Sequence, residues 1–239
     1  MGIHYNTKPP EGMCFCFDAL NPKCYSGSGT TFKDLISQTN GTATVTSPAT
    51  LGIVNSHLRF VPGATTRTAY VTFPNSSITV PTGWTGTWSW AQYFQDQGGI
   101  DHPNIGKEAG SIWDGINGFV FGTGWGLDGP RWGIGGTAYT VYTSSPIDYV
   151  ENAWQIWTVT YNGGVANGLK TYTNGVLNYQ QTPTATAIGS NANDLLIGAT
   201  NSRGGNWGGY MDIVQMWDRE LTAAEVAQNF NAIRGRFGL

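Results

Sequence analysis

Apolar and polar residues alternate in short segments from one end of the chain to the other. The segments are rich in aromatic and β-branched residues, and Gly, Pro, Asn or Ser lies at their boundaries. They are CFCFDA (14–19), HLRFV (57–61), TAYVTF (68–73), GTWSWAQYF (86–94), NGFVFG (117–122), AYTVYT (138–143), WQIWTVTY (154–161), LKTYT (169–173), VLNYQ (176–180), DLLIG (194–198) and MDIVQMW (211–217). A repeat of two places successive side chains on opposite faces, as in a β-strand. The chain is therefore predicted to be all-β.

The predicted strands are numerous enough for two stacked sheets around one core. The chain has 239 residues, 40% of them hydrophobic, and a β-sandwich of this size commonly forms one domain. DLLIG and IVQMW are apolar on both faces, which is typical of strands that are covered on both sides. We expect a two-sheet antiparallel jelly-roll sandwich over residues 13–239. Residues 1–12 are expected to form an extended N-terminal arm, either disordered or strapped onto a neighbouring subunit.

One turn can be identified from its residues alone. Asn174-Gly175 separates LKTYT from VLNYQ, and these residue types readily adopt the positive φ angles of a type I′ turn. The pattern predicts a β-hairpin over residues 169–180.

The segment after the last predicted strand has the pattern of an α-helix. Thr222 and Glu225 have the spacing of a capping box, and Leu221 precedes the cap at the position from which it can contact Val226. Gly235 is placed to end the helix. A single C-terminal helix is therefore predicted to cover a sheet with one apolar stripe, formed by Val226, Phe230 and Ile233.

Charge and hydropathy exclude two classes of partner. Only 11% of the residues are charged, the net charge is −3 and there is no basic run, so nucleic acid is not an expected partner. The opening MGIHYNTKPPEG has no apolar signal-peptide core, and no apolar stretch is long enough to span a bilayer. We expect a protein made in the cytoplasm without a signal peptide and without a membrane partner.

The three cysteines are Cys14, Cys16 and Cys24. Their number is odd and their spacing is not that of a zinc site. They are predicted to be buried free thiols.

Four motifs follow one another in the second half of the chain, namely WQIWTVTYNGG, LKTYTNGVL, DLLIGA and GGYMDIVQMWDRELTAAEVAQNFNAIRGRFGL. This succession resembles the laminin G-like domains of the concanavalin A-like lectin/glucanase superfamily. The opening CFDALNPKCYSGSGTTFKDL is similar to the start of this domain in tailed-phage structural proteins, with Cys24 and Phe32 in place of the usual Ser and Trp. The resemblance covers nearly all of residues 13–239 and implies a concanavalin A-like sandwich, although residues 100–146 match no motif.

No catalytic motif is present. The glucanase branch of the superfamily carries Glu-x-Asp-x-x-Glu on one strand, a spacing that brings together the carboxylates for glycoside hydrolysis. No glutamate of this chain has an Asp two residues further on, and no Gly-x-Ser-x-Gly motif occurs. We expect a protein that is not an enzyme. The residues considered were Glu11, Glu108, Glu151, Glu220 and Glu225, and the histidines His4, His57 and His102.

Gly-rich segments contain the candidate ligand-binding residues. An exposed indole can stack on a sugar ring, and the candidates are Trp113, Trp125, Trp132 and Trp207. The alternative is that these indoles fill the ends of the core. By contrast, Trp88, Trp90, Trp154 and Trp157 lie in strand patterns and are expected in the core or on a sheet face.

A calcium site is the one metal site that the resemblance suggests, because some laminin G-like domains hold this ion at the sandwich rim. The candidate ligands are Asp114 and Asp128, with turn capping as the alternative role. No cofactor is required by the sequence.

Two functions follow from these observations. The phage-like opening implies a virion structural protein, a capsid decoration or surface subunit of a tailed phage that contacts major capsid or tail subunits and copies of itself in a lattice. The weakly charged surface suits such packing. The alternative is a carbohydrate-binding adhesion module of lectin type, assisted by calcium, whose partner is a cell-surface glycan.

Overall fold

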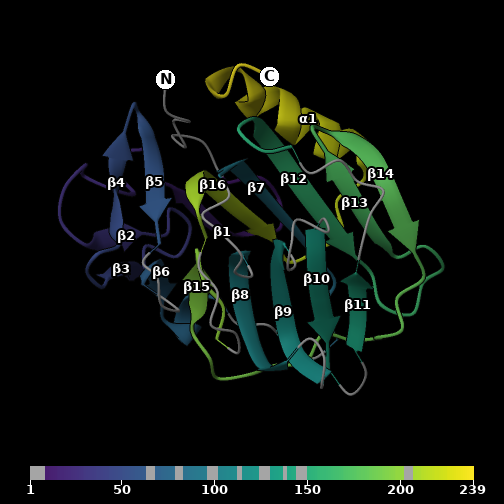
Figure 1. Cartoon of the computed structure of the whole chain (residues 1–239). Helices are drawn as coiled ribbons and strands as arrows, with labels where there is room; N and C mark the ends of the chain where they lie inside the picture. The colour runs from purple at the N-terminus through teal and green to yellow at the C-terminus, as the bar shows by residue number, and fades with distance from the viewer. Residues whose placement is uncertain are drawn as a thin grey trace.

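Two antiparallel sheets stack face to face, and one α-helix follows the last strand (Figure 1). The computed structural model describes residues 9–62, 68–78, 83–95, 102–111, 115–123, 130–136, 139–143, 150–201 and 207–239. The predicted all-β sandwich with a C-terminal helix is confirmed.

The first sheet, sheet A, carries the last strand and the helix. Its strands are β1 (Met13–Asp18), β4 (Thr50–Val54), β5 (His57–Val61), β7 (Gly86–Phe94), β12 (Trp154–Tyr161), β13 (Leu169–Thr173), β14 (Val176–Gln181) and β16 (Gly209–Trp217). They lie in the order β14-β13-β12-β7-β16-β5-β4, and β1 also pairs with β16. Thus β16 pairs with β5 at its start and with β1 further along.

Sheet B forms the other layer. Its strands are β2 (Thr31–Lys33), β3 (Asn40–Val45), β6 (Ala69–Phe73), β8 (His102–Ser111), β9 (Gly115–Thr123), β10 (Pro130–Gly135), β11 (Tyr139–Thr143) and β15 (Leu195–Ile197). They lie in the order β11-β10-β9-β8-β15-β6-β3-β2.

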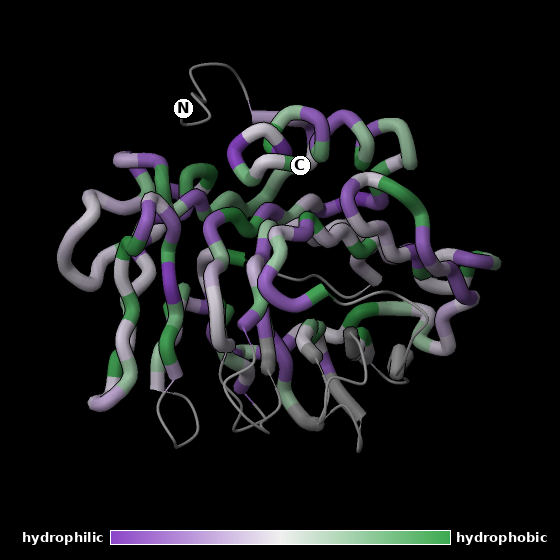
Figure 2. Tube along the Cα trace, turned by 45° about the horizontal axis from the view of Figure 1, so that its top comes forward, coloured by the Kyte–Doolittle hydropathy of each residue, from purple (hydrophilic) through white to green (hydrophobic). Residues whose placement is uncertain are grey.

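The core between the sheets is built from the apolar half of each alternating pattern. Hydrophobic and hydrophilic residues alternate along many strands (Figure 2). Trp88 and Trp90 of β7 face Phe121 of β9, with ring centroids 5.2 and 5.3 Å apart. Trp88, Trp90 and Trp157 are at most 1% exposed, so their predicted core positions are confirmed.

The predicted hairpin joins β13 to β14. Asn174 and Gly175 have φ angles of 52° and 77°, as a type I′ turn requires. The Asn174 side chain also accepts a hydrogen bond of 2.9 Å from the backbone N–H of Ile156, which ties the turn to β12.

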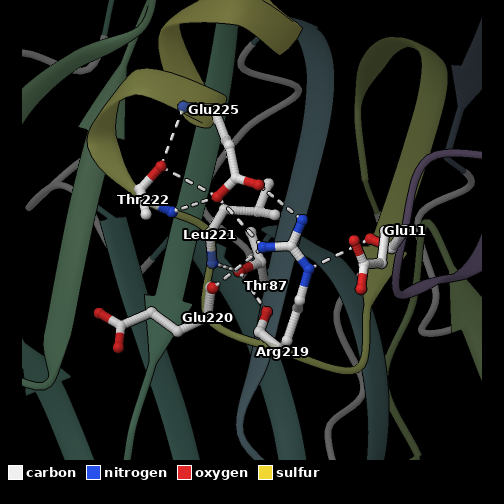
Figure 3. Close-up of polar contacts among 7 residues, drawn as sticks. All are labelled: Glu11, Thr87, Arg219, Glu220, Leu221, Thr222 and Glu225. Carbon is white, nitrogen blue, oxygen red and sulfur yellow. Dashed lines mark hydrogen bonds and ion pairs between the residues drawn. The ribbon is translucent and has the colours of Figure 1, made fainter.

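The helix α1 (Ala223–Ile233) begins at the predicted capping box (Figure 3). Thr222 Oγ1 accepts from the Glu225 N–H at 3.3 Å, and Glu225 Oε2 accepts from the Thr222 N–H at 2.8 Å. Arg219 holds the same carboxylate through a 2.6 Å ion pair, and the Leu221 N–H donates to Thr87 Oγ1 of β7 at 2.9 Å. The start of the helix is therefore fixed to the end of sheet A.

The stripe of α1 packs on the outer face of sheet A, away from sheet B. Val226 and Ile233 are buried and Phe230 is half-buried, as the pattern predicts. The α-helix ends at Ile233 with Arg234 as its C-cap, and the predicted terminator Gly235 follows within a short 3-10 turn (Arg234–Arg236). The left-handed glycine is Gly238, with φ 70°.

Residues 1–8 of the predicted arm lie outside the described residues, but its last residues contact the domain. Gly12 O accepts a hydrogen bond of 2.8 Å from Asp218 N, and Glu11 O accepts one of 3.2 Å from Arg219 Nε. The helices described here are all too short or too polar to cross a membrane.

The cysteines carry free thiols, as predicted. Cys16 and Cys24 are buried, whereas Cys14 is half-buried.

Candidate functional site

Two of the four predicted glycan-binding tryptophans lie in the core and not on a surface. Trp132 is 2% and Trp207 is 0% exposed. Their ring centroids lie 5.6 Å from Trp157 and 5.3 Å from Phe94, respectively, so both indoles are core residues. A buried indole cannot stack on a sugar, and the prediction was wrong for these two residues. The other two candidates, Trp113 and Trp125, lie outside the described residues.

The predicted calcium ligands Asp114 and Asp128 also lie outside the described residues. Among the residues that are described, no group of three or more His, Cys, Asp or Glu side chains could hold a metal ion.

Half-buried aromatic side chains gather on the outer face of sheet A. Trp154 of β12 lies opposite Tyr93 of β7, and Tyr93 lies opposite Tyr210 of β16. The ring centroid of Tyr93 is 5.8 Å from that of Trp154 and 5.5 Å from that of Tyr210. We call Trp154, Tyr93 and Tyr210 the aromatic row. The next residue in the same register, Arg59 of β5, lies opposite Tyr210.

The alternation of the strands explains why the row faces outward. On β7, Trp88, Trp90 and Phe94 are core residues, so the intervening Tyr93 points to the other face of sheet A. The helix α1 covers that face over Ala91 and its neighbours.

The C-terminal segment stops covering the outer face at the aromatic row. Phe237, which follows the helix, contacts the edge of the row, with its ring centroid 4.6 Å from that of Trp154. The row is therefore the part of this aromatic surface that the C-terminal segment leaves partly exposed.

Each side chain of the row ends in or carries a polar group that has no hydrogen-bond partner within the described part of the chain. The hydroxyl groups of Tyr93 and Tyr210 and the indole N–H of Trp154 form no hydrogen bond with the residues described there. Each side chain thus combines an apolar ring with a free polar group, the combination that serves ligand recognition in pockets and interfaces.

A buried acid, Asp212, contacts the histidine that packs against the row. Asp212 Oδ1 accepts a hydrogen bond of 2.7 Å from Leu58 N, and its Oδ2 lies 2.5 Å from Nδ1 of His57. The imidazole packs against the row, with its centroid 4.7 Å from that of Trp154. Burial raises the pKa of Asp212 above its ordinary value, against the opposing effect of the hydrogen bond from His57.

The His57–Asp212 pair has the form of two members of a catalytic triad. In such a triad the second ring nitrogen bonds a nucleophile. Within the described chain segments, His57 has no further hydrogen-bond partner, and its ring packs against Trp154.

A cavity of about 200 Å³ lies beside α1, lined by Trp217, Leu221, Gln228 and other residues. Its charged groups are Arg219 and Glu225, which pair with each other (Figure 3). This cavity therefore offers no free charge to a ligand, and the aromatic row is the stronger candidate.

The sequence pattern predicted Trp154 in the core or on a sheet face and did not single out Tyr93 or Tyr210. The available signal was their outward parity within GTWSWAQYF and GYMDIVQMW. Parity identifies a face, but the pairing register decides which residues are neighbours.

Two stacked antiparallel sheets, closed by one helix and bearing an aromatic surface, define a lectin-like jelly-roll domain. The sequence model of the laminin G-type concanavalin A-like lectin/glucanases superfamily matches residues 64–227, and the chain belongs to that superfamily. Among curated proteins, no sequence matches the chain.

Solved structures share the fold at low sequence identity. The binding domain of Paraclostridial Mosquitocidal Protein 1 is 16% identical, with a TM-score of 0.65 over 93% of this chain and 52% of that chain. Trypanosoma rangeli sialidase in complex with sialic acid is 13% identical, with a TM-score of 0.60 over 93% of this chain and 33% of that chain.

A third similar structure is nearer in length. Domain 4 of AbnA, a GH43 extracellular arabinanase from Geobacillus stearothermophilus, in complex with arabinotriose, is 15% identical, with a TM-score of 0.54. The match covers 90% of this chain and 97% of that domain, whereas the chain spans about half the length of the mosquitocidal-protein binding domain, of which 52% is covered.

Proposed function

We propose that the chain is a carbohydrate-binding module whose ligand lies on the aromatic row. The observation that carries the proposal is the alignment of Trp154, Tyr93 and Tyr210 on adjacent strands, half-exposed and with free polar tips. Sugar rings present apolar faces and hydroxyl groups, and such a surface can contact both.

The dimensions of the site suit an extended ligand. Adjacent strands are spaced by about 4.8 Å, so the four positions from Trp154 to Arg59 span about 14 Å. This length accommodates more than one sugar ring. The arabinanase domain, which shares the fold and was solved with arabinotriose, supports a binding role for a sandwich of this kind.

We propose that the module binds without catalysing a reaction. Three carboxylates are held in ion pairs: Glu220 pairs with Lys170, Glu225 with Arg219, and Asp18 with Arg236. The contacts of the aromatic row require no metal. Binding is therefore expected to persist in EDTA, and incubation with a bound glycan is expected to release no reducing ends.

The test is a titration of the protein with a panel of neutral and acidic oligosaccharides, followed by tryptophan fluorescence and calorimetry. Substitution of Trp154 by Ala should weaken binding by about tenfold or more, as is typical of a central aromatic contact. Tyr93→Ala and Tyr210→Ala should each weaken it to a smaller extent.

Tyr70 provides a matched control. This tyrosine is also half-buried, but it lies on β6 of sheet B. Its sequence neighbours Ala69 and Val71 both pair with residues of β3. Tyr70→Ala should leave affinity unchanged. Equal affinity of the wild type and the Trp154→Ala variant for every bound glycan would reject the aromatic row as the site.

A second function is a structural subunit of a tailed-phage particle. It is favoured by the phage-like opening and by apolar side chains at the edge of sheet A, where Val176 is 65% and Leu177 is 44% exposed on β14. Such an edge suits contact with other copies of the chain or with capsid or tail subunits, and it is compatible with glycan binding.

This second function predicts co-sedimentation of the purified protein with phage particles. Val176→Asp should reduce co-sedimentation, because a charge would be buried in the contact. Thr50→Asp, an exposed position on β4 at the opposite edge of sheet A, is the control for added charge.

A further inference from the structure

Arg59 extends the aromatic row with a positive charge. It lies directly opposite Tyr210 in the register of β5 and β16, and its Cζ atom is 5.8 Å from the centre of the Tyr210 ring. The guanidinium group is therefore held beside the last ring of the row.

The guanidinium of Arg59 has no protein partner in the described part of the chain. Its Nε atom is shielded from solvent and donates a hydrogen bond to no neighbour among the described residues. The other arginine side chains that the structure describes are all engaged. Arg219 pairs with Glu225, Arg236 pairs with Asp18, and Arg234 donates to the backbone oxygen of Leu239.

Two buried acids of sheet A, Asp212 and Asp18, are engaged by groups other than Arg59. Asp212 of β16 is used by His57 and by the backbone of Leu58, and Asp18 of β1 is used by Arg236. A shielded N–H donor without an acceptor is unfavourable. A ligand that supplies an acceptor would remove this penalty.

We infer that the aromatic row binds an acidic glycan, with the carboxylate of a sugar-acid residue paired to Arg59. The planar guanidinium matches a carboxylate in two parallel hydrogen bonds, while the adjacent rings contact the sugar. This inference rests on the proposed function and adds the chemical class of its ligand.

The test compares each acid with its own methyl ester, which keeps the sugar and removes the charge. The probes are oligogalacturonate, oligomannuronate and sialyllactose, each as the free acid and as the methyl ester. At least one acid should bind at least about tenfold more tightly than its ester, and added salt should reduce this preference.

Variants assign the preference to one side chain. Arg59→Gln should abolish the preference for the acid while retaining the affinity for the ester, and Arg59→Lys should retain part of the preference. Arg234→Gln is the matched control, because Arg234 also lies over an aromatic ring, at 5.8 Å from Phe230, but outside the row. It should leave the preference intact. Melting temperatures identify any variant that fails to fold, and the comparison of acid with ester in the wild type does not depend on variants.

The outcomes separate the two proposals. Equal binding of acid and ester, with both lost in Trp154→Ala, overturns the role of Arg59 and leaves the proposed function standing. A preference for the acid that survives Arg59→Gln also overturns this role. Absence of binding by the acids and the esters, together with the neutral oligosaccharides of the panel, overturns both proposals.

Discussion

Asp212 Oδ2 lies 2.5 Å from His57 Nδ1 at the point where β16 changes its neighbour from β5 to β1. The register of β16 against β7 shifts between Met211 and Ile213, so Asp212 occupies a bulge. Its other oxygen accepts from the Leu58 N–H. The carboxylate thus accepts a backbone hydrogen bond near the start of β5 and orients the imidazole that packs on the aromatic row.

Replacing Asp212 should therefore affect stability in a pH-dependent way. Burial raises the pKa of Asp212 above its ordinary value of 3.8, so the folded protein favours the protonated acid. The stabilisation from this preference is complete below pH 3.8 and is lost as the pH rises through the raised pKa. Asp212→Asn keeps a neutral side chain at every pH.

The free energy of unfolding of the wild type should thus fall relative to that of Asp212→Asn as the pH rises from below 3.8 through the raised pKa. Urea unfolding of both proteins at several pH values measures this change. A wild type that gains stability relative to Asp212→Asn as the pH rises would contradict the assignment. Asp212→Ala, which leaves Leu58 N–H unpaired, should cost about 1–3 kcal/mol.

The capping box predicts a loss of stability in acid. The hydrogen bond from Arg219 lowers the pKa of Glu225 to about 2 from 4.5. Its contribution is therefore present above pH 4.5 and is lost as the pH falls towards 2. Because this side chain is 34% exposed, solvent screening limits the effect to about 1 kcal/mol. Glu225→Gln should reduce the slope of stability between these pH values, measured by thermal unfolding with Asp218→Asn as control.

Two tryptophans should respond differently to truncation. Trp207 is fully buried, so Trp207→Ala should lower the free energy of unfolding by about 3–5 kcal/mol. Trp154 is only half-buried, and Trp154→Ala should cost only about 1–2 kcal/mol. Chemical denaturation of both variants distinguishes core from surface, and equal losses would show that the row is part of the core.

The thiols should be unreactive in the folded protein. Burial raises the pKa of Cys14 to about 12 and that of Cys24 to about 11, against an ordinary 9.0. Since the thiolate is the reactive form, alkylation by iodoacetamide at pH 8 should be slower than in urea by at least about a hundredfold. Mass spectrometry of the labelled protein gives the rates, and fast labelling of the native state would exclude the buried environment.

The hairpin glycine should resist substitution. Gly175 has φ 77°, and a Cβ atom placed there would lie 3.0 Å from the Phe230 ring. Gly175→Ala should therefore cost about 1–2 kcal/mol from backbone strain, with some further loss from contact with the helix. Gly164, which also has a positive φ of 76° but has only a distant contact at 4.0 Å, is the control that reports strain alone.

The strands with strong alternation were predictable, and those without it were not. GTWSWAQYF and WQIWTVTY alternate clearly and form β7 and β12. By contrast, β8 reads HPNIGKEAGS and β10 reads PRWGIG, where glycines, a proline and the charged pair Lys107-Glu108 obscure the period. These strands form because their neighbours in sheet B supply backbone partners, which is information that a local pattern does not contain.

The candidate site was less predictable than the fold. Gly-rich context suggested that Trp132 and Trp207 were exposed, but aromatic packing placed both in the core. Tyr93 and Tyr210 lie 117 positions apart in the sequence numbering and become neighbours only through the pairing of β7 with β16. Long-range register is the quantity that a single sequence specifies least directly.

Strand pairing fixes the distances between the side chains of the aromatic row. These distances are set by main-chain hydrogen bonds between β12, β7, β16 and β5, and not by flexible connections. Exchanging one side chain would change the chemistry at that position of the row, while the spacing between positions stays the same. A combinatorial library at Trp154, Tyr93, Tyr210 and Arg59 would thus explore new specificities on a constant geometry, which makes this face a starting point for engineered reagents.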